Sequence, residues 1–125
     1  MRAVVVTDQA VEVQDVKKPE PKPNEVLVQV RACGLNRADL MVAGGMAHGA
    51  TGGGTIVGME FSGEIVGLGS EVKNFKEGDR VMCHGTESWA DYAVADWGRT
   101  VKIPDTNMSF DQAATLPVSL YLSLI

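Results

Sequence analysis

The stretch VLVQVRA, residues 26–32, has the most regular pattern in the chain. Its even positions are all apolar, whereas glutamine and arginine occur at odd positions, and this two-residue period is typical of a β-strand with one fully buried face. Residues 4–6 and 11–13 alternate in a similar way on either side of a polar segment, residues 7–9. These two segments predict an N-terminal β-hairpin.

Further short strands are predicted at residues 61–68, 81–83 and 89–94. Gly63 and Gly67 lie inside the first of them, and glycines at such positions permit the sharp bends and close backbone approaches of a small barrel. Many short strands with frequent glycine and proline between them favour a barrel or a sandwich over an alternating β-α-β chain. The predicted fold class is therefore mainly β with short helices, an α+β protein built on a β-barrel.

Two short helices and one long loop complete the predicted elements. Asn36 is a suitable N-cap, and Asp39 three residues later can reach back to free backbone donors of the same turn. Seven glycines lie within residues 44–58, which predicts a loop without regular structure that opens or covers a cleft. Ser109 and Gln112 have the spacing of a capping box and predict the second helix.

The charge and hydropathy of the chain exclude several classes of partner. With 11 Lys and Arg against 16 Asp and Glu, the formal net charge is −5, and the cationic residues are scattered. The pattern offers no basic face, so we expect no nucleic-acid partner. No apolar run approaches the ~20 residues of a membrane-spanning helix, so we expect no membrane partner. Cys33 and Cys83 lack CxxC spacing and the N-terminus has no leader pattern, which predicts a cytoplasmic protein.

The C-terminal stretch, residues 116–125, is almost wholly apolar and ends without a polar stop. Such a stretch exposes an apolar surface unless another segment covers it. We therefore expect a truncated chain, in which residues 1–117 form one domain and residues 118–125 begin an interdomain helix. A homodimer that buries the apolar C-terminus is the other way to cover this surface.

Five motifs occur in one order along nearly the whole chain. They are ACGLNRADLM at residues 32–41, GMEFSG at 58–63, EGDRV at 77–81, WADY at 89–92, and a segment at 103–117 that begins with IP and ends with AATLP. The set resembles the medium-chain dehydrogenase/reductase superfamily, specifically its zinc-free quinone oxidoreductase branch. This resemblance implies a GroES-like catalytic domain, and it implies that the dinucleotide is bound mainly by a Rossmann domain that the chain lacks.

The resemblance also bears on metal binding. The alcohol dehydrogenase relatives hold a catalytic zinc with a Cys at the position matching Asn36 and a His at the position matching Met59. An amide is a poor zinc ligand beside thiolate or imidazole, and a thioether prefers softer ions, so we expect no metal site. The remaining candidates lack chelate spacing and are interpreted as two buried thiols and two loop histidines, namely Cys33, Cys83, His48 and His84.

Loss of the metal changes which substrates are chemically suitable, because a plain ketone needs a Lewis acid to stabilise charge on its oxygen during hydride transfer. A quinone or an α,β-unsaturated carbonyl spreads that charge by conjugation, so a few hydrogen-bond donors suffice. The resemblance therefore implies hydride transfer from NADPH or NADH to such a small-molecule acceptor. The nicotinamide supplies the hydride, and the protein supplies position and electrostatics.

The resemblance places the cofactor near Asn36, whose counterpart in the family lies beside the nicotinamide and ribose. We predict Asn36 as a catalytic and cofactor-binding residue, while a plain helix cap is the alternative. Arg37 is a candidate to bind a cofactor phosphate or another acidic group. The alternative is a solvated surface arginine without such a role. In the segment that matches residues 116–123, relatives often contact the cofactor through a threonine. Ser119 or Ser123 is the candidate to replace that threonine.

Glu60 matches a glutamate that lies behind the metal in the zinc-dependent relatives. Without a cation it must accept hydrogen bonds, pair with an arginine or hold a proton. We predict a catalytic role as general acid, with a structural ion pair as the alternative. Three methionines and one histidine predict an adaptable pocket for the substrate. The alternative is that these methionines only fill the core. These pocket candidates are Met41, Met46, His48 and Met59.

A dinucleotide-binding fingerprint within the chain would change this interpretation. Residues 67–72, GLGSEV, follow a predicted strand and partly match one. They lack its third small residue, and residues 73–78 do not continue as a helix of useful length, so we reject the match.

Two other functions compete with that of an oxidoreductase fragment. The first is a stand-alone GroES-like binding module. A co-chaperonin is the most specific example, because it has the same barrel and a mobile loop. The second is a structural or regulatory domain that has lost catalysis. The reductase motifs favour the oxidoreductase fragment over both.

Overall fold

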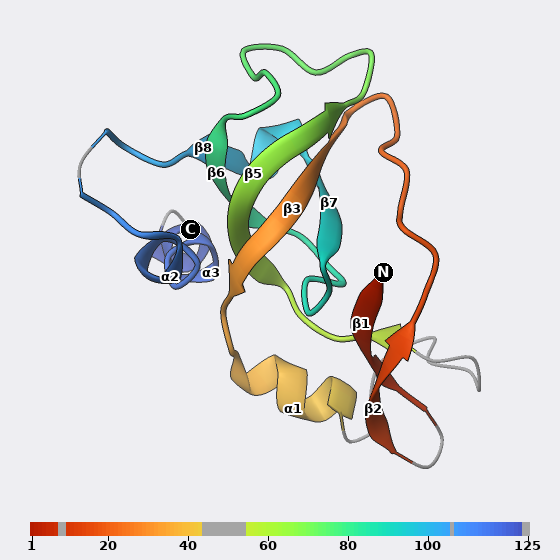
Figure 1. Ribbon diagram of the computed structural model, residues 1–125. Helices are drawn as coiled ribbons and strands as arrows, with labels where there is room; N and C mark the ends of the chain where they lie inside the picture. The colour runs from red at the N-terminus through yellow and green to blue at the C-terminus, as the bar shows by residue number, and fades with distance from the viewer. Residues whose placement is uncertain (8–9, 44–54, 106, 124–125) are drawn as a thin grey trace.

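The computed structural model describes residues 1–7, 10–43, 55–105 and 107–123. Its elements in chain order are β1 (Arg2–Val6), β2 (Val11–Asp15), β3 (Glu25–Cys33), α1 (Arg37–Ala43), β4 (Thr55–Ile56), β5 (Glu60–Leu68), β6 (Arg80–His84), β7 (Tyr92–Asp96), η1 (Trp97–Arg99), β8 (Thr100–Lys102), α2 (Phe110–Ala113) and α3 (Pro117–Ser123). The strands form two sheets, one in the order β2-β1-β4 and one in the order β7-β3-β5-β6-β8 (Figure 1).

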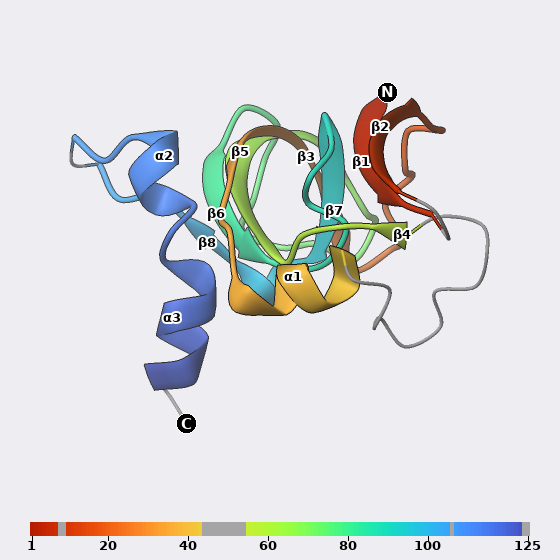
Figure 2. The ribbon, with the colours of Figure 1, turned by 90° about the horizontal axis from the view of Figure 1, so that it is seen from below.

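The five-stranded sheet curls into a barrel-like shape, with α1 across one end and α2 and α3 to one side (Figure 2). Every neighbouring pair in this sheet is antiparallel, and two register shifts interrupt the pairing of β3 with β5. Such irregularities bend a sheet. Gly63 permits the tightest approach of these two strands, because a Cβ atom there would collide with the carbonyl oxygen of Gln29. The predicted fold class, mainly β with short helices around a GroES-like barrel, is confirmed.

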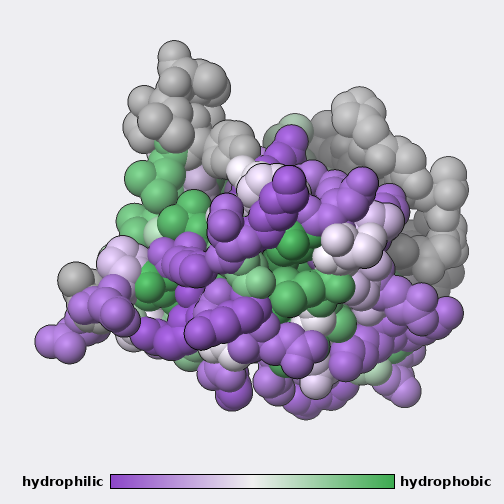
Figure 3. All heavy atoms as spheres, turned by 90° about the horizontal axis from the view of Figure 1, so that it is seen from above, coloured by the Kyte–Doolittle hydropathy of each residue, from purple (hydrophilic) through white to green (hydrophobic). Residues whose placement is uncertain are grey.

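The inner face of the curled sheet carries the main hydrophobic core. Val26 and Val28, on the predicted buried face of β3, are fully buried. The view from above in Figure 3 shows hydrophobic residues at the centre, surrounded by hydrophilic ones. Full burial of one such aliphatic side chain contributes about 1.5–3 kcal/mol, so this cluster is a major source of stability. The core cluster consists of Val26, Val28, Phe61, Ile65, Val81, Cys83, Ala93 and Ala95.

The N-terminal hairpin forms as predicted, with β1 antiparallel to β2 and Val4 opposite Val13. The hairpin is joined to the other sheet by an isolated bridge between Ala3 and Ala90. At this bridge the N–H group of Val4 donates to the carbonyl oxygen of Trp89 at 2.8 Å. The predicted strand over residues 89–94 is therefore displaced. Its first residues bridge to β1, whereas the ladder with β3 is made by β7, which begins at Tyr92.

Two further predictions of secondary structure need correction. Residues 44–58 were expected to lack regular structure, but Thr55 and Ile56 form β4 and pair with the end of β1. Both residues are β-branched, and this favours a strand at the point where the glycine-rich stretch gives way to larger side chains. The sequence also predicted no strand at β8, which pairs with β6 through three residues. Residues 44–54 of the expected loop lie outside the described part of the chain.

The helices are short. The capping box at the start of α2 is confirmed, with the Ser109 hydroxyl accepting from the Gln112 N–H group and the Gln112 side chain accepting from the Ser109 N–H group. Residues 67–72 do not form a dinucleotide-binding turn, as the sequence predicted. Residues 69–79 form turns and irregular structure that lead into the antiparallel strand β6, where a dinucleotide fingerprint would need a helix. In the described ranges, no helix has the length and apolar character needed to cross a membrane.

Candidate functional site

Three polar side chains meet where β3 ends, α1 begins and β5 begins. We call Asn36, Asp39 and Glu60 the polar cluster. Asp39 and Glu60 are only 2% and 4% exposed. Burial of polar side chains is unfavourable unless hydrogen bonds replace those to water, so the contacts within this cluster decide what it can do.

Glu60 uses both of its carboxylate oxygens as acceptors. The Asn36 Nδ2 group donates to Oε1 at 2.9 Å, and the backbone N–H group of Val118 donates to Oε2 at 3.0 Å. Of the three states expected for this glutamate, the structure shows the hydrogen-bonded one. No arginine pairs with Glu60 among the residues described. The side chain thus links the start of α1 to the first turn of α3.

Asp39 completes the start of α1. Its Oδ2 atom accepts from the backbone N–H group of Asn36 at 2.7 Å, as the capping prediction required. The side chain of Asn36 differs from a plain N-cap, because no helix N–H group among the described residues donates to its Oδ1 atom, while its Nδ2 group donates to Glu60. The other Asp39 oxygen, Oδ1, is buried without a hydrogen-bond partner in the described structure. Burial raises the pKa of Asp39, the Asn36 N–H bond lowers it, and the charge of Glu60 raises it further.

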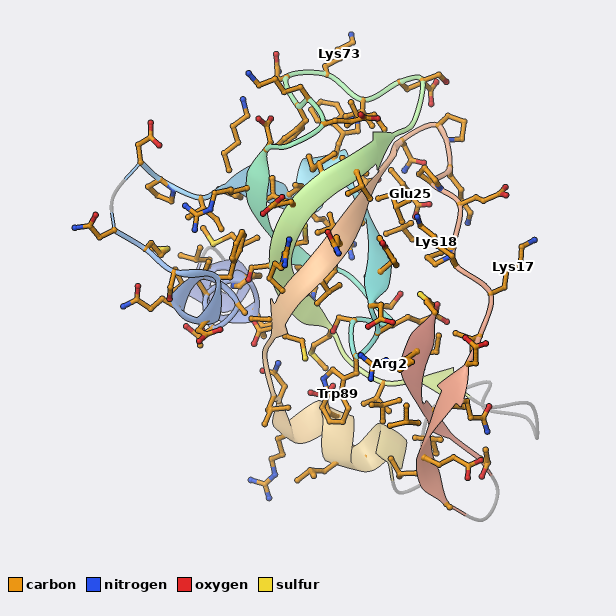
Figure 4. The ribbon with its side chains drawn as sticks, viewed as in Figure 1. Arg2, Lys17, Lys18, Glu25, Lys73 and Trp89 are labelled. Atoms are coloured by element: carbon orange, nitrogen blue, oxygen red, sulfur yellow. The ribbon has the colours of Figure 1, made fainter. Side chains whose placement is uncertain are left out.

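Gly34 makes the close packing of Glu60 possible. A Cβ atom at Gly34 would collide with the Glu60 side chain, and the Gly34 N–H group donates to the Glu60 carbonyl oxygen at 3.0 Å. From the other side, the indole N–H group of Trp89 reaches the Gly34 carbonyl oxygen at 3.4 Å. Trp89 lies below the end of β3, above α1 (Figure 4). Gly34, Trp89 and the Val118 amide are parts of the site that sequence reasoning missed.

His84 lies opposite Glu60 in the pairing of β5 with β6. The prediction of a loop histidine is wrong here, because His84 is the last residue of β6. Burial lowers the pKa of His84, the charge of Arg99 lowers it further, and the charge of Glu60 partly offsets both. Burial and the charge of Arg99 thus favour the neutral imidazole.

The two cysteines are free thiols, and both are poor nucleophiles. Burial raises the pKa of Cys83 to about 12, and Cys83 is fully enclosed in the core as predicted. Cys33 is only partly buried, so the expectation of a buried thiol is too strong there. Burial and the charge of Asp39 raise its pKa as well. Since the thiolate is the reactive form, neither residue is a candidate nucleophile.

The predicted site residues fall into three groups. Asn36 and Glu60 are brought together, and Met59 is partly buried next to Glu60 in the chain. Three others are exposed on helices, and among the described residues none of them forms an ion pair or side-chain hydrogen bond; they are Arg37, Met41 and Ser119. Outside the description lie Met46, His48 and the side chain of Ser123.

The donor chemistry at these positions does not fit the zinc site of the alcohol dehydrogenase relatives. The Asn36 amide nitrogen is a donor to Glu60, and Met59 offers only a thioether. Across the part of the chain that is described, no three His, Cys, Asp or Glu side chains are grouped so that they could hold a metal ion. We therefore derive no step through a metal.

Comparison with known proteins gives consistent results. The family model of the alcohol dehydrogenase GroES-like domain matches residues 22–105. The rat quinone oxidoreductase-like protein 2 is 37% identical over 121 residues, which are 94% of this chain and 34% of the relative. The human synaptic vesicle membrane protein VAT-1 homolog-like is 37% identical over 108 residues, which are 86% of this chain and 26% of the relative.

Solved structures agree with these matches. The crystal structure of the human VAT-1 homolog-like protein superimposes with a TM-score of 0.88 at 36% identity, covering 100% of this chain and 43% of that one. A mycobacterial protein, Rv1454c, in complex with NADPH gives a TM-score of 0.81 at 25% identity, covering 91% of this chain and 37% of that one.

Fold and motif order define a GroES-like domain. The chain belongs to the alcohol dehydrogenase GroES-like domain family of the medium-chain dehydrogenase/reductase superfamily, among members that include quinone oxidoreductases and enoyl reductases. It spans about a quarter to a third of the length of the curated relatives described above.

Proposed function

We propose that this chain forms the catalytic domain of an NAD(P)H-dependent oxidoreductase that reduces quinones or α,β-unsaturated carbonyls without zinc. In this proposal residues 1–117 form the domain, and residues 118–125 begin a helix that leads to a dinucleotide-binding domain. The single observation that carries it is the hydrogen bond from the Asn36 Nδ2 group to Glu60. It holds a neutral amide where zinc-dependent relatives place a metal ligand.

The proposed role of Asn36 is to orient the cofactor. Because Nδ2 donates to Glu60, the amide has a defined orientation and its Oδ1 atom, which has no partner among the described residues, remains an acceptor. A hydroxyl or N–H group of the nicotinamide nucleoside is a suitable donor for this atom. The bound nicotinamide supplies the hydride, and this chain supplies position and polarity. The NADPH complex of the mycobacterial neighbour supports a nicotinamide cofactor at the family level.

Glu60 is proposed as a positioning residue. Both of its oxygens are occupied by N–H donors, so the side chain acts as an acceptor that holds the Asn36 amide and the first turn of α3. The predicted general-acid role is retained as the alternative, because a proton must reach the reduced acceptor. The dependence of kcat/KM on pH, measured for the original protein and for Glu60→Gln, separates the two roles. If Glu60 is a general acid, the variant loses an ionisation from the profile; if Glu60 is a positioning residue, the variant has a lower profile of the same shape.

The remaining candidates keep their predicted roles in this proposal. Arg37 is exposed without an ion pair in the described part of the chain, which suits contact with a cofactor phosphate, and the two serines of α3 suit contact with the carboxamide. The substrate pocket is proposed next to Glu60, at Met59, together with Met41, Met46 and His48. A conjugated acceptor fits such a site because it needs hydrogen-bond donors and apolar contact, not a Lewis acid.

The test joins this chain to a dinucleotide-binding domain of the medium-chain dehydrogenase/reductase superfamily and follows NADPH oxidation. Benzoquinone is expected to be reduced and cyclohexanone is not, and a zinc chelator is expected to leave the rate unchanged. The Asn36→Ala variant should lower kcat/KM by about tenfold to a hundredfold, since it removes a group that orients the reaction. Asn107→Ala, an exposed asparagine remote from the cluster, is the matched control.

Two results would contradict the proposal. If Asn36→Ala and Asn107→Ala have the same kcat/KM, Asn36 is only a structural residue. The second result is a fusion that folds and binds NADPH but does not oxidise it, whichever quinone or enone is added. The stand-alone binding module or the non-catalytic domain would then be the better interpretation.

A further inference from the structure

A hollow of about 470 Å³ lies beside the polar cluster, between β1, the end of β3 and the segment that carries Trp89. We propose that it binds a small amphipathic carboxylate, a ligand distinct from the quinone or enone of the proposed reaction. Neither Asn36 nor Glu60 lines this hollow. We call it the β1–β3 hollow.

The hollow results from the way the two sheets part. β7 pairs with β3 only as far as Gln29, and the chain before β7 then crosses to β1 at the bridge between Ala3 and Ala90. The last residues of β3, from Arg31 to Cys33, therefore have no ladder partner on that side. A gap opens between β1 and the end of β3, and its volume lies within the range of small-molecule sites.

The walls of the hollow are mainly apolar. Val4, Val13 and Val30 contribute aliphatic surface, and Trp89 contributes an aromatic ring. Leu35 is 77% exposed, although large apolar side chains gain from being covered. Ser88 also lines the hollow, but its Oγ atom lies against Gly58 and is buried, so it does not offer a polar contact. An apolar ligand body thus has more surface to cover than polar groups to satisfy.

Two arginines provide the polar recognition. Arg2 and Arg31 line the hollow, with side chains 80% and 47% exposed, and Asp91 lines it as well, so that two cations face one anion. Their nearest carboxylates are at 3.9 Å, from Arg2 Nε to Asp91, and at 3.7 Å, from Arg31 Nη2 to Glu64. Both distances are too long for hydrogen bonds, so the guanidinium donors are available to a ligand. Arginine recognises carboxylates through paired N–H groups, which makes a carboxylate the matching head group.

The occupant we infer has an aromatic or aliphatic body against Trp89 and a single carboxylate at the arginines. Figure 4 shows Arg2 and Trp89 close together at this end of the molecule, whereas Lys73 lies at the opposite end. Lys73 is therefore a cation of equal charge that is remote from the hollow. It provides the control for nonspecific attraction between an anionic ligand and the protein.

The experiment titrates the unmodified chain with phenylbutyrate and with its neutral analogue phenylbutanol. The sequence has two tryptophans, Trp89 and Trp97, so two indole N–H signals in a nitrogen–proton NMR spectrum report on the location. We expect a saturable shift of the Trp89 signal with phenylbutyrate, no shift of Trp97, and binding of phenylbutanol that is about tenfold weaker. This comparison needs no variant and measures no turnover, and neither Asn36 nor Glu60 lines the hollow, so its failure is distinguishable from a failure of the proposed reductase activity.

Variants then test whether Arg2 and Arg31 bind the carboxylate of the ligand. Arg2→Gln combined with Arg31→Gln should weaken phenylbutyrate binding by about fivefold to twentyfold, the effect of two exposed ion pairs, and leave phenylbutanol binding within about twofold. Lys73→Gln should leave both within about twofold. Equal affinity for the acid and the alcohol, a shift of Trp97 as large as that of Trp89, or equal weakening by Lys73→Gln would each overturn the proposal.

Discussion

The hydrophobic core cluster and the two carboxylates of the polar cluster are both buried but are held in different ways. Phe61 in the core is stabilised by packing, which depends on volume and little on direction. Glu60, its neighbour in β5, is stabilised by two hydrogen bonds from residues 24 and 58 positions away in the sequence. One strand thus begins with a residue of the site and continues with a residue of the core, and substitutions at the two should have different consequences.

The largest expected effect is on the core. Phe61→Ala removes a fully buried ring and leaves a cavity, so we expect the free energy of unfolding to fall by about 3–5 kcal/mol, measured by urea denaturation. Phe61→Leu keeps most of the volume and should lose less than half of that. A loss below about 1 kcal/mol for Phe61→Ala, the size expected of an average substitution, would mean that the cluster is not the main source of stability.

Gly34→Ala probes the contact between the two regions. The added Cβ atom collides with the Glu60 side chain, so we expect a loss of about 1–3 kcal/mol and a weakened hydrogen bond between Asn36 and Glu60. Gly67→Ala is the control in β5, because its Cβ atom would meet Leu27 at 3.3 Å, a tight contact that a small shift can relieve. Equal losses in the two variants would show that Glu60 moves aside freely.

Asp39 should make the stability depend on pH. Its pKa is raised in the folded protein, chiefly by burial. The contribution of Asp39 to the free energy of unfolding is therefore fully present below its pKa in the unfolded chain, about 4. It is lost as the pH rises through the higher pKa of the folded protein. In this window just above pH ~4, Asp39→Asn should become progressively more stable relative to the original chain.

Urea denaturation at a series of pH values measures this difference. The exposed Asp105 provides the control, and Asp105→Asn should show no such trend. A difference between Asp39→Asn and the original chain that stays constant with pH, or changes in the opposite direction, would show that the folded site does not disfavour the Asp39 carboxylate.

Thiol labelling gives the smallest effect and separates the regions by access. Cys83 belongs to the core, with a pKa of about 12, whereas Cys33 is only partly buried at the end of β3. Under native conditions at mildly alkaline pH, a disulfide reagent should label Cys33 slowly and Cys83 not at all. After denaturation in urea both should react. Equal native rates would indicate that the core opens far more readily than its packing suggests.

The elements that sequence could predict are those with a local signal. The two-residue period identified β3 and the hairpin, and the spacing of Ser109 and Gln112 identified the start of α2. β4 and β8 were missed because two or three residues are too short for a period, and their pairing with β1 and β6 decides their conformation. β7 was displaced because Trp89 and Ala90 bind β1 instead of β3.

The site shows the same division. Asn36 and Glu60 were identified from a resemblance to known motifs. Asp39 was predicted only as a capping carboxylate, and its contact with Asn36 is local enough to predict. The contact between Asn36 and Glu60 is not local, and neither is the bond from the Val118 amide to Glu60. A proline at position 117 marks a helix start and thus an amide in need of an acceptor, but nothing in the sequence says which carboxylate provides it.

The central claim is that Glu60 acts by orienting the Asn36 amide. A double-mutant cycle on the kcat/KM of the fusion with benzoquinone tests it most directly, using Asn36→Ala, Glu60→Gln and the double variant. We predict that Glu60→Gln lowers kcat/KM by about tenfold when Asn36 is present and by less than about twofold when Asn36 is already alanine. The same factor in both backgrounds would contradict the account, because Glu60 would then act independently of Asn36.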